Sequence, residues 1–415
     1  MKELNEKGKK AREAAYFLAL AATSDKDEVL NTVAEKLVSS SKTILSANEK
    51  DMKIAREAGL KGAILDRLLL TEERIASMAE GLKQIALLED PVGEVLSMKK
   101  RPNGLNIGQK RVPMGVIGII YESRPNVTAD VFGLCLKTGN AAILRGGKEA
   151  YNSNHSITAL IQEVLQEKKF PVESLQLVED TSRESALALM KLEEYLDLLI
   201  PRGGAGLIRT VVENSHVPVI ETGVGNCHIY VDDSADIEKA VAITINAKTQ
   251  RPGVCNAAES LLVHKGIAEE FLQKAGKELT SNKVEIRGDK KVCELISEAV
   301  PAKEEDWSTE FLDLIISAKV VSSMDEAISH IRNYGSGHSE AILTENYSHA
   351  HEFLNRVDAA AVYVNASTRF TDGFEFGFGA EIGISTQKLH ARGPMGLKEL
   401  TSTKYIIYGD GQVRE

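Results

Sequence analysis

Hydrophobic positions in the first hundred residues recur at three- and four-residue steps. Two such series occur, at Leu30, Val33 and Leu37 and again at Leu65, Leu68 and Leu69. This spacing places apolar side chains on one face of a helix. The surrounding residues are mostly Ala, Leu, Lys and Glu, which favour helix. The pattern therefore predicts a layer of helices that packs against a sheet.

The pattern changes at residues 112–121, where a short, continuous apolar run replaces the helical period. Such a run is typical of a strand that is buried on both faces. Strand-like and helical segments then alternate: helix 127–137, strand 141–144, helix 150–168, strand 175–178, helix 182–192, strand 196–200, helix 204–214 and strand 217–220. Strands joined by helical crossovers predict a doubly wound, mostly parallel α/β sheet. Ligands bind such sheets at the carboxyl ends of the strands.

A second α/β pattern begins after residues 221–226. Its expected elements are strand 228–231, a helix from 237 to about 248, and strands near 260–263, 318–321, 341–343 and 361–364. We therefore expect two doubly wound domains, one formed by residues 1–97 and 114–225 and the other by residues 226–400.

Residues 98–113 and 401–415 remain outside these two domains. The first segment predicts a hairpin that turns at Pro102-Asn103-Gly104, and the second contains a strand at 404–408. Neither has an obvious partner in either domain. An isolated hairpin and a terminal strand predict pairing with another subunit, so we expect a homo-oligomer.

Composition and charge exclude several classes of protein. The 415 residues are 43% hydrophobic and 27% charged, which is ordinary for a folded globular chain and excludes general disorder. No apolar stretch approaches the roughly 18 residues of a membrane span, and the N-terminus lacks a signal peptide, so we expect a cytoplasmic protein. A formal net charge of −10 argues against nucleic-acid binding. The four cysteines include no Cys-x-x-Cys pair, so no metal is expected.

Cys255 is the candidate nucleophile. It follows a Pro-Gly turn between a helix and a strand, where a thiol is exposed enough to react, whereas Cys135 lies among apolar residues within a helix. Catalytic thiols need a positive setting, and Lys248 and Arg251 are near in sequence. Most cysteines are small buried hydrophobic residues, and spacing alone leaves that alternative open for Cys255.

Polar residues also follow four expected strands of the first domain. Arg124 and Asn126 follow the first strand, where Asn126 could cap the next helix or face a developing oxyanion. The other strand ends carry Arg145-Gly146-Gly147-Lys148, Gly203-Gly204 and Glu221. Two cations beside bare backbone suit an adenosine phosphate, although ordinary loops with solvated charges have the same composition. The chain has neither a Gly-x-Gly-x-x-Gly fingerprint nor a P-loop.

This set of residues, in this order, resembles the aldehyde dehydrogenase superfamily. Cys255 follows Glu221 by 34 residues, close to the spacing of the superfamily's catalytic glutamate and cysteine. Longer segments are similar to the γ-glutamyl phosphate reductase branch: residues 48–70, 120–130, 139–150, 251–259, 330–342 and 376–397. The resemblance therefore covers nearly the whole chain.

The resemblance implies an aldehyde dehydrogenase-like fold and a reaction. The reaction is NADPH-dependent reduction of L-glutamyl 5-phosphate to L-glutamate 5-semialdehyde, with release of phosphate, in the second step of proline biosynthesis. Cys255 would form a thioester, Asn126 and the backbone N–H of Cys255 would hold the oxyanion, and Glu221 would be a third catalytic group. Glutamate 5-kinase is the enzyme that could hand over the substrate.

The resemblance also implies binding residues. Those for the cofactor are Arg145, Gly146, Gly147, Lys148, Gly203, Gly204 and Glu310. Glu310 lies near Glu304, Glu305 and Asp306, so it could instead be one more solvated acidic residue. Candidates for binding the substrate's carboxylate and amine are Arg124, His338, Ser339 and Arg392, which the sequence does not rank.

Two other interpretations stay open. An NAD-dependent hydrolytic aldehyde dehydrogenase needs Glu221, which is present, but tryptophan is missing before Asn126 and Gly-Gly-Lys replaces the expected Pro-Ser-Glu. A non-catalytic protein of the same fold would be expected to have lost Cys255 or Asn126, and the chain has both.

Overall fold

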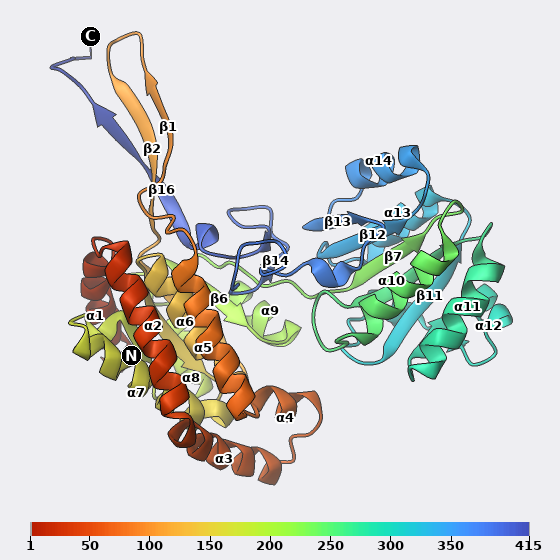
Figure 1. Ribbon diagram of the computed structural model, residues 1–415, viewed down its shortest axis with the longest axis horizontal. Coiled ribbons are helices and arrows are strands. Elements are labelled where there is room, and N and C mark those ends of the chain that lie inside the picture. The colour runs from red at the N-terminus through yellow and green to blue at the C-terminus, as the bar shows by residue number, and fades with distance from the viewer. Residues whose placement is uncertain (1, 415) are drawn as a thin grey trace. The chain divides into compact units, whose positions relative to one another are not determined.

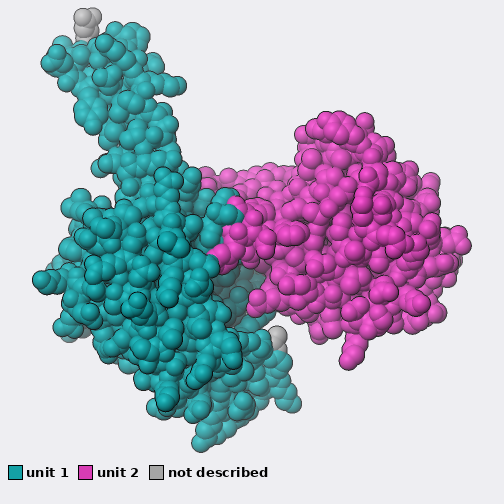
Figure 2. Space-filling model, in the orientation of Figure 1, with its two compact units in different colours: residues 1–222, 377–383, 395–415 teal, residues 223–376, 384–394 magenta. Residues whose placement is uncertain are grey.

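The structure is a computed structural model that describes residues 2–414. It divides into two compact units, one comprising Met1–Thr222, Gly377–Gly383 and Met395–Glu415 and the other comprising Gly223–Phe376 and Ile384–Pro394 (Figure 2). The boundary between the two units follows residue 222, whereas the sequence predicted it after residue 225. Residues 377–383 and 395–400, expected in the second domain, belong to the first unit. Local periodicity could not indicate this return, because these segments consist mainly of turns and loops.

The N-terminal part of the first unit is helical, as its apolar spacing predicts. The helices are α1 (Lys2–Leu18), α2 (Thr23–Ser39), α3 (Ser41–Glu57), α4 (Ala63–Leu68) and α5 (Glu72–Leu87). Leu30, Val33 and Leu37 of α2 are all buried. Within residues 2–414, no helix is both long and apolar enough to span a lipid bilayer.

The first unit contains a parallel sheet in the order β5-β4-β3-β6. Its strands are β3 (Val116–Tyr121), β4 (Ala141–Gly146), β5 (Leu175–Leu177) and β6 (Leu198–Arg202). The helices that follow these strands are α6 (Asn126–Lys137), α7 (Tyr151–Glu167), α8 (Arg183–Met190) and α9 (Ala205–Asn214). Every residue of β3 is buried, as its continuous apolar run predicts.

The strand expected at residues 217–220 is wrong. Only an isolated bridge between Leu199 and Val219 joins this segment to β6. Pro218 has no N–H to donate, and the segment is attached through the N–H groups of Leu199 and Ile220. Glu221 therefore begins a loop rather than ending a strand.

The second unit contains a parallel sheet in the order β10-β9-β11-β8-β7-β12-β13. Its strands are β7 (Cys227–Val231), β8 (Ala258–His264), β9 (Glu285–Gly288), β10 (Val300–Pro301), β11 (Ile315–Val321), β12 (Ser339–Leu343) and β13 (Ala361–Val364). Strands β9 and β10 were not predicted from the sequence. The four residues of β9 include a single large apolar side chain, Ile286, and β10 is only two residues long.

Helices cover both faces of this second sheet (Figure 1). One face packs against α10 (Ile237–Thr249), α11 (Ala268–Ser281) and α12 (Lys290–Leu295), the other against α13 (Met324–Tyr334) and α14 (Tyr347–Arg356). Ile229 and Val231 of β7 belong to the first apolar cluster and Tyr230 to the second. Successive side chains of a strand point to opposite faces, so one apolar run supplies both cores. The expected doubly wound α/β fold is confirmed.

A third sheet extends from the first unit (Figure 1). The expected hairpin is present as β1 (Val95–Lys100) and β2 (Asn106–Pro113). The terminal strand β16 (Thr401–Tyr408) pairs antiparallel with β2 of this hairpin, a pairing that was not predicted, and the pairing of the sheet with another subunit stays a prediction. Its partner was not apparent because the two strands lie almost three hundred residues apart. The small β14 (Ile384–Ser385) and β15 (Gly393–Pro394) pair with each other.

Candidate active site

Cys255 lies in a turn between α10 and the amino end of β8, and it is half-buried. The next residue, Asn256, anchors this turn: its Nδ2 donates to the carbonyl of Thr371 at 2.9 Å, and its own carbonyl accepts from Thr368 Oγ1 at 2.7 Å. A Cβ atom at Gly225 would lie 1.6 Å from the Cys255 carbonyl oxygen, so only glycine fits there. The turn that carries the thiol is therefore held by close packing.

Cys227 and His338 pack behind this turn. The Cys227 thiol donates to the Cys255 carbonyl at 3.1 Å and lies 3.7 Å from His338 Nδ1. His338 and Ser339 are both fully buried, and the Ser339 hydroxyl contacts His338 Nδ1 at 2.8 Å and Thr371 Oγ1 at 2.6 Å. Burial lowers the pKa of His338 to about 4, so its ring is neutral near pH 7. These positions argue against the expected substrate contacts of His338 and Ser339, which instead support the nucleophile's turn.

Lys248 does not supply the expected positive charge for the thiol. It forms an ion pair with Glu259 at 2.5 Å, and neither side chain has any exposed surface. Burial lowers the pKa of Lys248 and raises that of Glu259 to about 7. Because the ammonium is already paired, it is not available to Cys255.

Glu310 lies beside the Cys255 turn. Its carboxylate accepts from the N–H of Gly225 at 2.8 Å, and Gly225 itself packs against the Cys255 backbone. The interpretation of Glu310 as an isolated, solvated acidic residue is therefore wrong. Its contact with a cofactor stays a prediction.

Arginines, rather than Lys248, provide positive charge near the thiol. Arg369 lies in the 3₁₀ helix Thr368–Phe370, is half-buried, and donates from Nε to Gln250 Oε1 at 2.9 Å. Burial and the nearby guanidinium of Arg251 lower the pKa of Arg369, whereas Asp372 and the Cys255 thiol act to raise it. Arg251 was a candidate from the sequence, but Arg369 was not, because it lies far from Cys255 in the sequence and belongs to no recognisable motif.

The remaining substrate candidates occupy different surroundings. Arg392 is exposed and donates to Asp358 at 2.7 Å, and the same carboxylate also pairs with Lys388. Arg392 is thus engaged in an ion pair at the surface, and its contact with the substrate stays a prediction. Arg124 is half-buried in the loop that joins β3 to α6.

The first unit gathers its candidate residues at one edge of its sheet. Tyr121 at the end of β3 lies opposite Gly146 at the end of β4 and Arg202 at the end of β6, so the following loops begin side by side. Asn126 is exposed and opens α6 without capping it, so the expected helix cap is wrong. Its Nδ2 donates to Asp130 Oδ2 at 2.9 Å.

Asp130 is a carboxyl group with perturbed acidity. Burial raises the pKa of Asp130 to about 6, although the hydrogen bond from Asn126 and the charge of Arg202 both oppose this rise. Asp130 was not predicted from the sequence. Its position four residues after Asn126 in a predicted helix could have indicated it, because residues at this spacing face each other.

Of the two cations expected to bind an adenosine phosphate at the end of β4, Arg145 and Lys148, only one is available. Arg145 donates from Nη2 to the carbonyls of Thr181 and Ser182 at 2.6 and 2.7 Å, so it mainly fastens that loop. Lys148, in the 3₁₀ helix Lys148–Ala150, is exposed. The exposed cation at this strand end is thus Lys148, whereas Arg145 is engaged by carbonyl groups.

Neighbouring side chains approach the glycines at these strand ends closely. A Cβ at Gly146 would lie 2.3 Å from Asn154 Nδ2, and one at Gly147 would lie 2.2 Å from Glu149 Oε1. A Cβ at Gly203 would lie 2.6 Å from Glu122 Oε2, and the same oxygen accepts from the N–H of Gly204 at 2.9 Å.

Glu221 is half-buried in the loop after the 217–220 segment.

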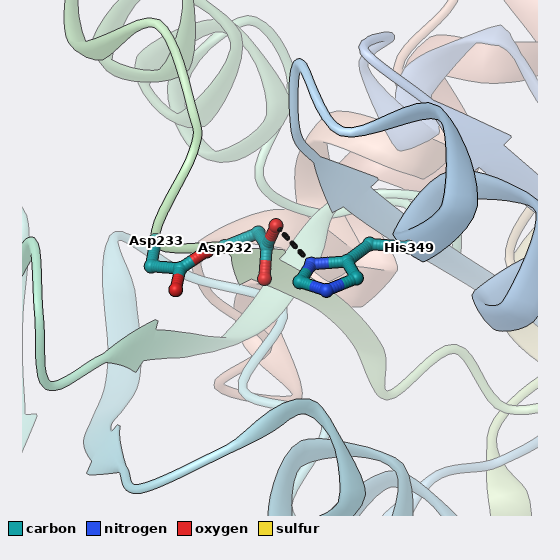
Figure 3. A group of neighbouring side chains, drawn as sticks. All are labelled: Asp232, Asp233 and His349. Atoms are coloured by element: carbon teal, nitrogen blue, oxygen red, sulfur yellow. Dashed lines mark hydrogen bonds and ion pairs between the residues drawn. The ribbon is translucent and has the colours of Figure 1, made fainter.

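Asp232, Asp233 and His349 form a separate group of possible metal ligands (Figure 3). The group lies at the carboxyl end of β7, whereas Cys255 precedes the amino end of the neighbouring β8. Ligand atoms of Asp232, Asp233 and His349 lie within 4.8 Å of one another. Asp232 accepts hydrogen bonds from His349 Nδ1 at 2.7 Å and from the hydroxyls of Tyr230, Ser234 and Thr344. The Asp232 carboxylate is therefore already engaged in hydrogen bonds within the protein. These bonds link β7 to α14 and to the end of β12.

Comparison with known proteins identifies the family of the chain. Residues 2–299 and 295–406 match the model of the aldehyde dehydrogenase family. The chain is 63% identical over 419 residues to the γ-glutamyl phosphate reductase of Caldicellulosiruptor bescii and 61% identical over 414 residues to that of Clostridium botulinum, with full coverage of all chains. The crystal structure of γ-glutamyl phosphate reductase from Thermotoga maritima matches with a TM-score of 0.96 and 56% identity over the whole of both chains. The chain therefore belongs to the aldehyde dehydrogenase family and, within it, to the γ-glutamyl phosphate reductases.

Proposed function

We propose that the protein reduces L-glutamyl 5-phosphate to L-glutamate 5-semialdehyde and releases phosphate, using NADPH, as a step of proline biosynthesis. One observation carries the proposal: a half-buried cysteine on a tightly held turn, with an arginine beside it, in a chain that is 63% identical to an enzyme named for this reduction. The expected homo-oligomer and the handover of substrate by glutamate 5-kinase are part of the same proposal.

Cys255 acts as the nucleophile. Its thiolate attacks the acyl carbon, the new C–S bond forms, and the C–O bond to the phosphoryl group breaks with its electron pair going to phosphate. The resulting thioester is reduced, and the thiolate leaves again when the aldehyde carbonyl forms. The half-buried setting of Cys255 limits access of water, which would otherwise hydrolyse the thioester.

Asn126 and the backbone N–H of Cys255 stabilise the oxyanion. One N–H of the Asn126 carboxamide is already given to Asp130, which fixes the direction of the amide and leaves the second N–H for the substrate. Donors held in advance cost no reorganisation when negative charge develops on the carbonyl oxygen.

The residues of the first unit fit a phosphate-bearing dinucleotide. Lys148 presents an exposed ammonium at the end of β4, and a Cβ at Gly204 would meet only Glu122 Oε2, at 4.0 Å. Lys148 would hold a phosphate, and Glu310 in the second unit would hold the ribose. NADPH, when bound, supplies the hydride that reduces the acyl group.

The proposal is tested in the oxidative direction. Glutamate semialdehyde, NADP⁺ and phosphate should together produce absorbance at the nicotinamide band, and omission of phosphate should abolish it. Cys255→Ser should remove the activity and retain NADPH binding, because a hydroxyl without a dedicated base is a poor nucleophile. Phosphate-independent oxidation would instead indicate a hydrolytic aldehyde dehydrogenase. Unchanged turnover in Cys255→Ser would rule out Cys255 as the nucleophile.

A further inference from the structure

Arg251 and Arg369 place two positive charges near the Cys255 thiol. Arg251 opens the turn that contains Cys255, and Arg369 interacts electrostatically with both Arg251 and Cys255. Within residues 2–414, neither guanidinium forms an ion pair with a carboxylate, although the charge of Asp372 acts on Arg369 more strongly than the Cys255 thiol does. Like charges close together, without a paired anion, create a local positive potential.

The position of Arg369 is well defined. Asn256, adjacent to the nucleophile, donates to the carbonyls of Arg369 and Thr371 at 3.3 and 2.9 Å, and the Ser367 hydroxyl accepts from the Arg369 N–H. The Nε bond to Gln250 orients the guanidinium plane and leaves its two terminal nitrogens for another partner. The cation is thus fastened to the same turn as the thiol.

The chemistry of the group favours a phosphoryl ligand. A guanidinium presents paired N–H groups that match the oxygens of phosphate, and a half-buried arginine gains most from a partner that carries more than one negative charge. The thiolate of Cys255 benefits from the same charges before a ligand arrives.

We propose that Arg369, assisted by Arg251, binds the phosphoryl group of the substrate beside Cys255 and holds the phosphate as it leaves. The identity of the substrate rests on the proposed function, whereas the anion site rests on the two arginines. In an acyl phosphate, one oxygen separates phosphorus from the carbon that Cys255 attacks, whereas the α-carboxylate lies at the other end of the molecule. A cation beside the thiol therefore meets the phosphoryl group, and it offsets the charge gained when the C–O bond breaks.

Alkylation of the thiols tests the anion site without cofactor or substrate. Anionic iodoacetate and neutral iodoacetamide are compared, and the modified cysteines are located by peptide mass spectrometry. Cys293, also half-buried and close to the carboxylate of Asp289, is the internal reference. We expect iodoacetate to be favoured at Cys255 relative to Cys293, inorganic phosphate to suppress that preference, and Arg369→Gln to reduce it by roughly fivefold. Arg251→Gln should reduce it less.

Two control variants sharpen the result. Arg369→Lys retains the charge but loses the paired donors, so it should keep most of the iodoacetate preference yet weaken protection by phosphate. Arg332→Gln, which removes an exposed arginine from α13, should change neither. A preference that survives in Arg369→Gln, or protection by L-glutamate but not by phosphate, would overturn the phosphoryl assignment.

Steady-state kinetics separates this proposal from the proposed function. In phosphate-dependent oxidation of glutamate semialdehyde, Arg369→Gln should raise the KM for phosphate at least about fivefold more than the KM for the aldehyde. Equal effects on both would overturn the phosphoryl assignment. If the wild-type protein oxidises no glutamate semialdehyde, the proposed function fails, and the alkylation experiment still decides whether the anion site exists.

Discussion

At the scale of single residues, the contact between Asn126 and Asp130 has a consequence for pH. The pKa of Asp130, raised by burial to about 6, lies above its unfolded value near 3.9. The protonated carboxyl is therefore favoured by folding, and its contribution to stability is present at low pH and lost as pH rises through about 6. Ionised Asp130, in contrast, accepts a stronger hydrogen bond from Asn126 Nδ2 than the protonated form does, and it therefore fixes the orientation of the Asn126 amide more firmly.

We expect Asp130→Asn to remove the effect of pH both on stability and on the orientation of the Asn126 amide, because asparagine does not titrate. The free energy of unfolding, measured with urea at pH 5 and pH 8, should depend less on pH than in the wild-type protein. A step near pH 6 in the pH profile of kcat should disappear in the same variant. If both profiles keep the wild-type form, Asp130 neither titrates in this range nor positions Asn126.

Asn126 and Glu221 should differ in their importance for turnover. Removal of one oxyanion donor costs about 10²–10³ in kcat, and we expect Asn126→Ala to fall in that range. Glu221→Gln should cost clearly less, because hydride rather than activated water resolves the thioester in the reductive direction. The measurement is reductive turnover at saturating NADPH, with folding checked by circular dichroism. A greater loss in Glu221→Gln would make Glu221 the base for the thiol.

Lys148 should distinguish the two nicotinamide cofactors. Because Arg145 is engaged by the carbonyls of Thr181 and Ser182, the exposed Lys148 is the cation left to meet a 2′-phosphate. Lys148→Glu should raise the KM for NADPH by about tenfold or more and leave that for NADH almost unchanged. Similar changes in both Michaelis constants would show that Lys148 does not contact the 2′-phosphate.

At the scale of elements, the buried pair of Lys248 and Glu259 joins the end of α10 to the start of β8, on either side of the Cys255 turn. Breaking a buried ion pair by removing one partner leaves an uncompensated charge, at a cost of about 3–5 kcal/mol. Glu259→Gln should therefore lower the free energy of unfolding by an amount in this range.

A double variant, Lys248→Met with Glu259→Leu, removes both charges and provides the comparison. It should recover much of the stability that Glu259→Gln loses, since apolar groups of similar volume often replace a buried pair without net cost. Urea unfolding of the three proteins measures the difference. Equal destabilisation in the single and double variants would show that the lost packing, rather than the unpaired charge, is decisive.

Elements with a clear apolar period could be predicted from the sequence, and others could not. The apolar run at 116–121 forms a fully buried strand, as predicted, because a short, continuous apolar segment is buried most readily on both faces of a parallel sheet. The segment 217–220 has the composition of a strand, but Pro218 cannot complete the ladder. Pairing of β16 with β2 depends on contacts distant in sequence, which no local pattern encodes.

The same division applies to the candidate site. Cys255 and Asn126 could be named as candidates because the first follows a Pro-Gly turn and the second follows a buried strand. Arg369 could not, because only packing of its 3₁₀ helix against Asn256 brings it near the thiol. The burial of His338 and the bonds of Arg145 to carbonyls likewise depend on tertiary contacts rather than on sequence pattern.

At the scale of the whole molecule, the β1-β2-β16 sheet leaves two strands with a free edge, β1 and β16. Their apolar side chains are largely exposed, among them Val95 at 48%, Tyr405 at 70% and Ile407 at 59%. A free, apolar edge strand favours pairing with another chain, and natural proteins usually block such edges with charge when pairing is not used. We therefore expect this sheet to join copies of the chain.

The double substitution Tyr405→Lys and Ile407→Lys places two charges on β16 and tests this expectation. We expect multi-angle light scattering to report an oligomer for the wild-type protein and a smaller mass for the variant, because charged edge strands resist pairing. Lys404→Gln, a change at an exposed position of the same strand that removes a charge, should leave the mass unaltered. Circular dichroism and thermal unfolding must show that both variants remain folded, since the sheet extends from the first unit rather than forming its core. If the lysine variant keeps the wild-type mass, subunits associate through another surface, and the exposed apolar residues of β1 and β16 need a different explanation.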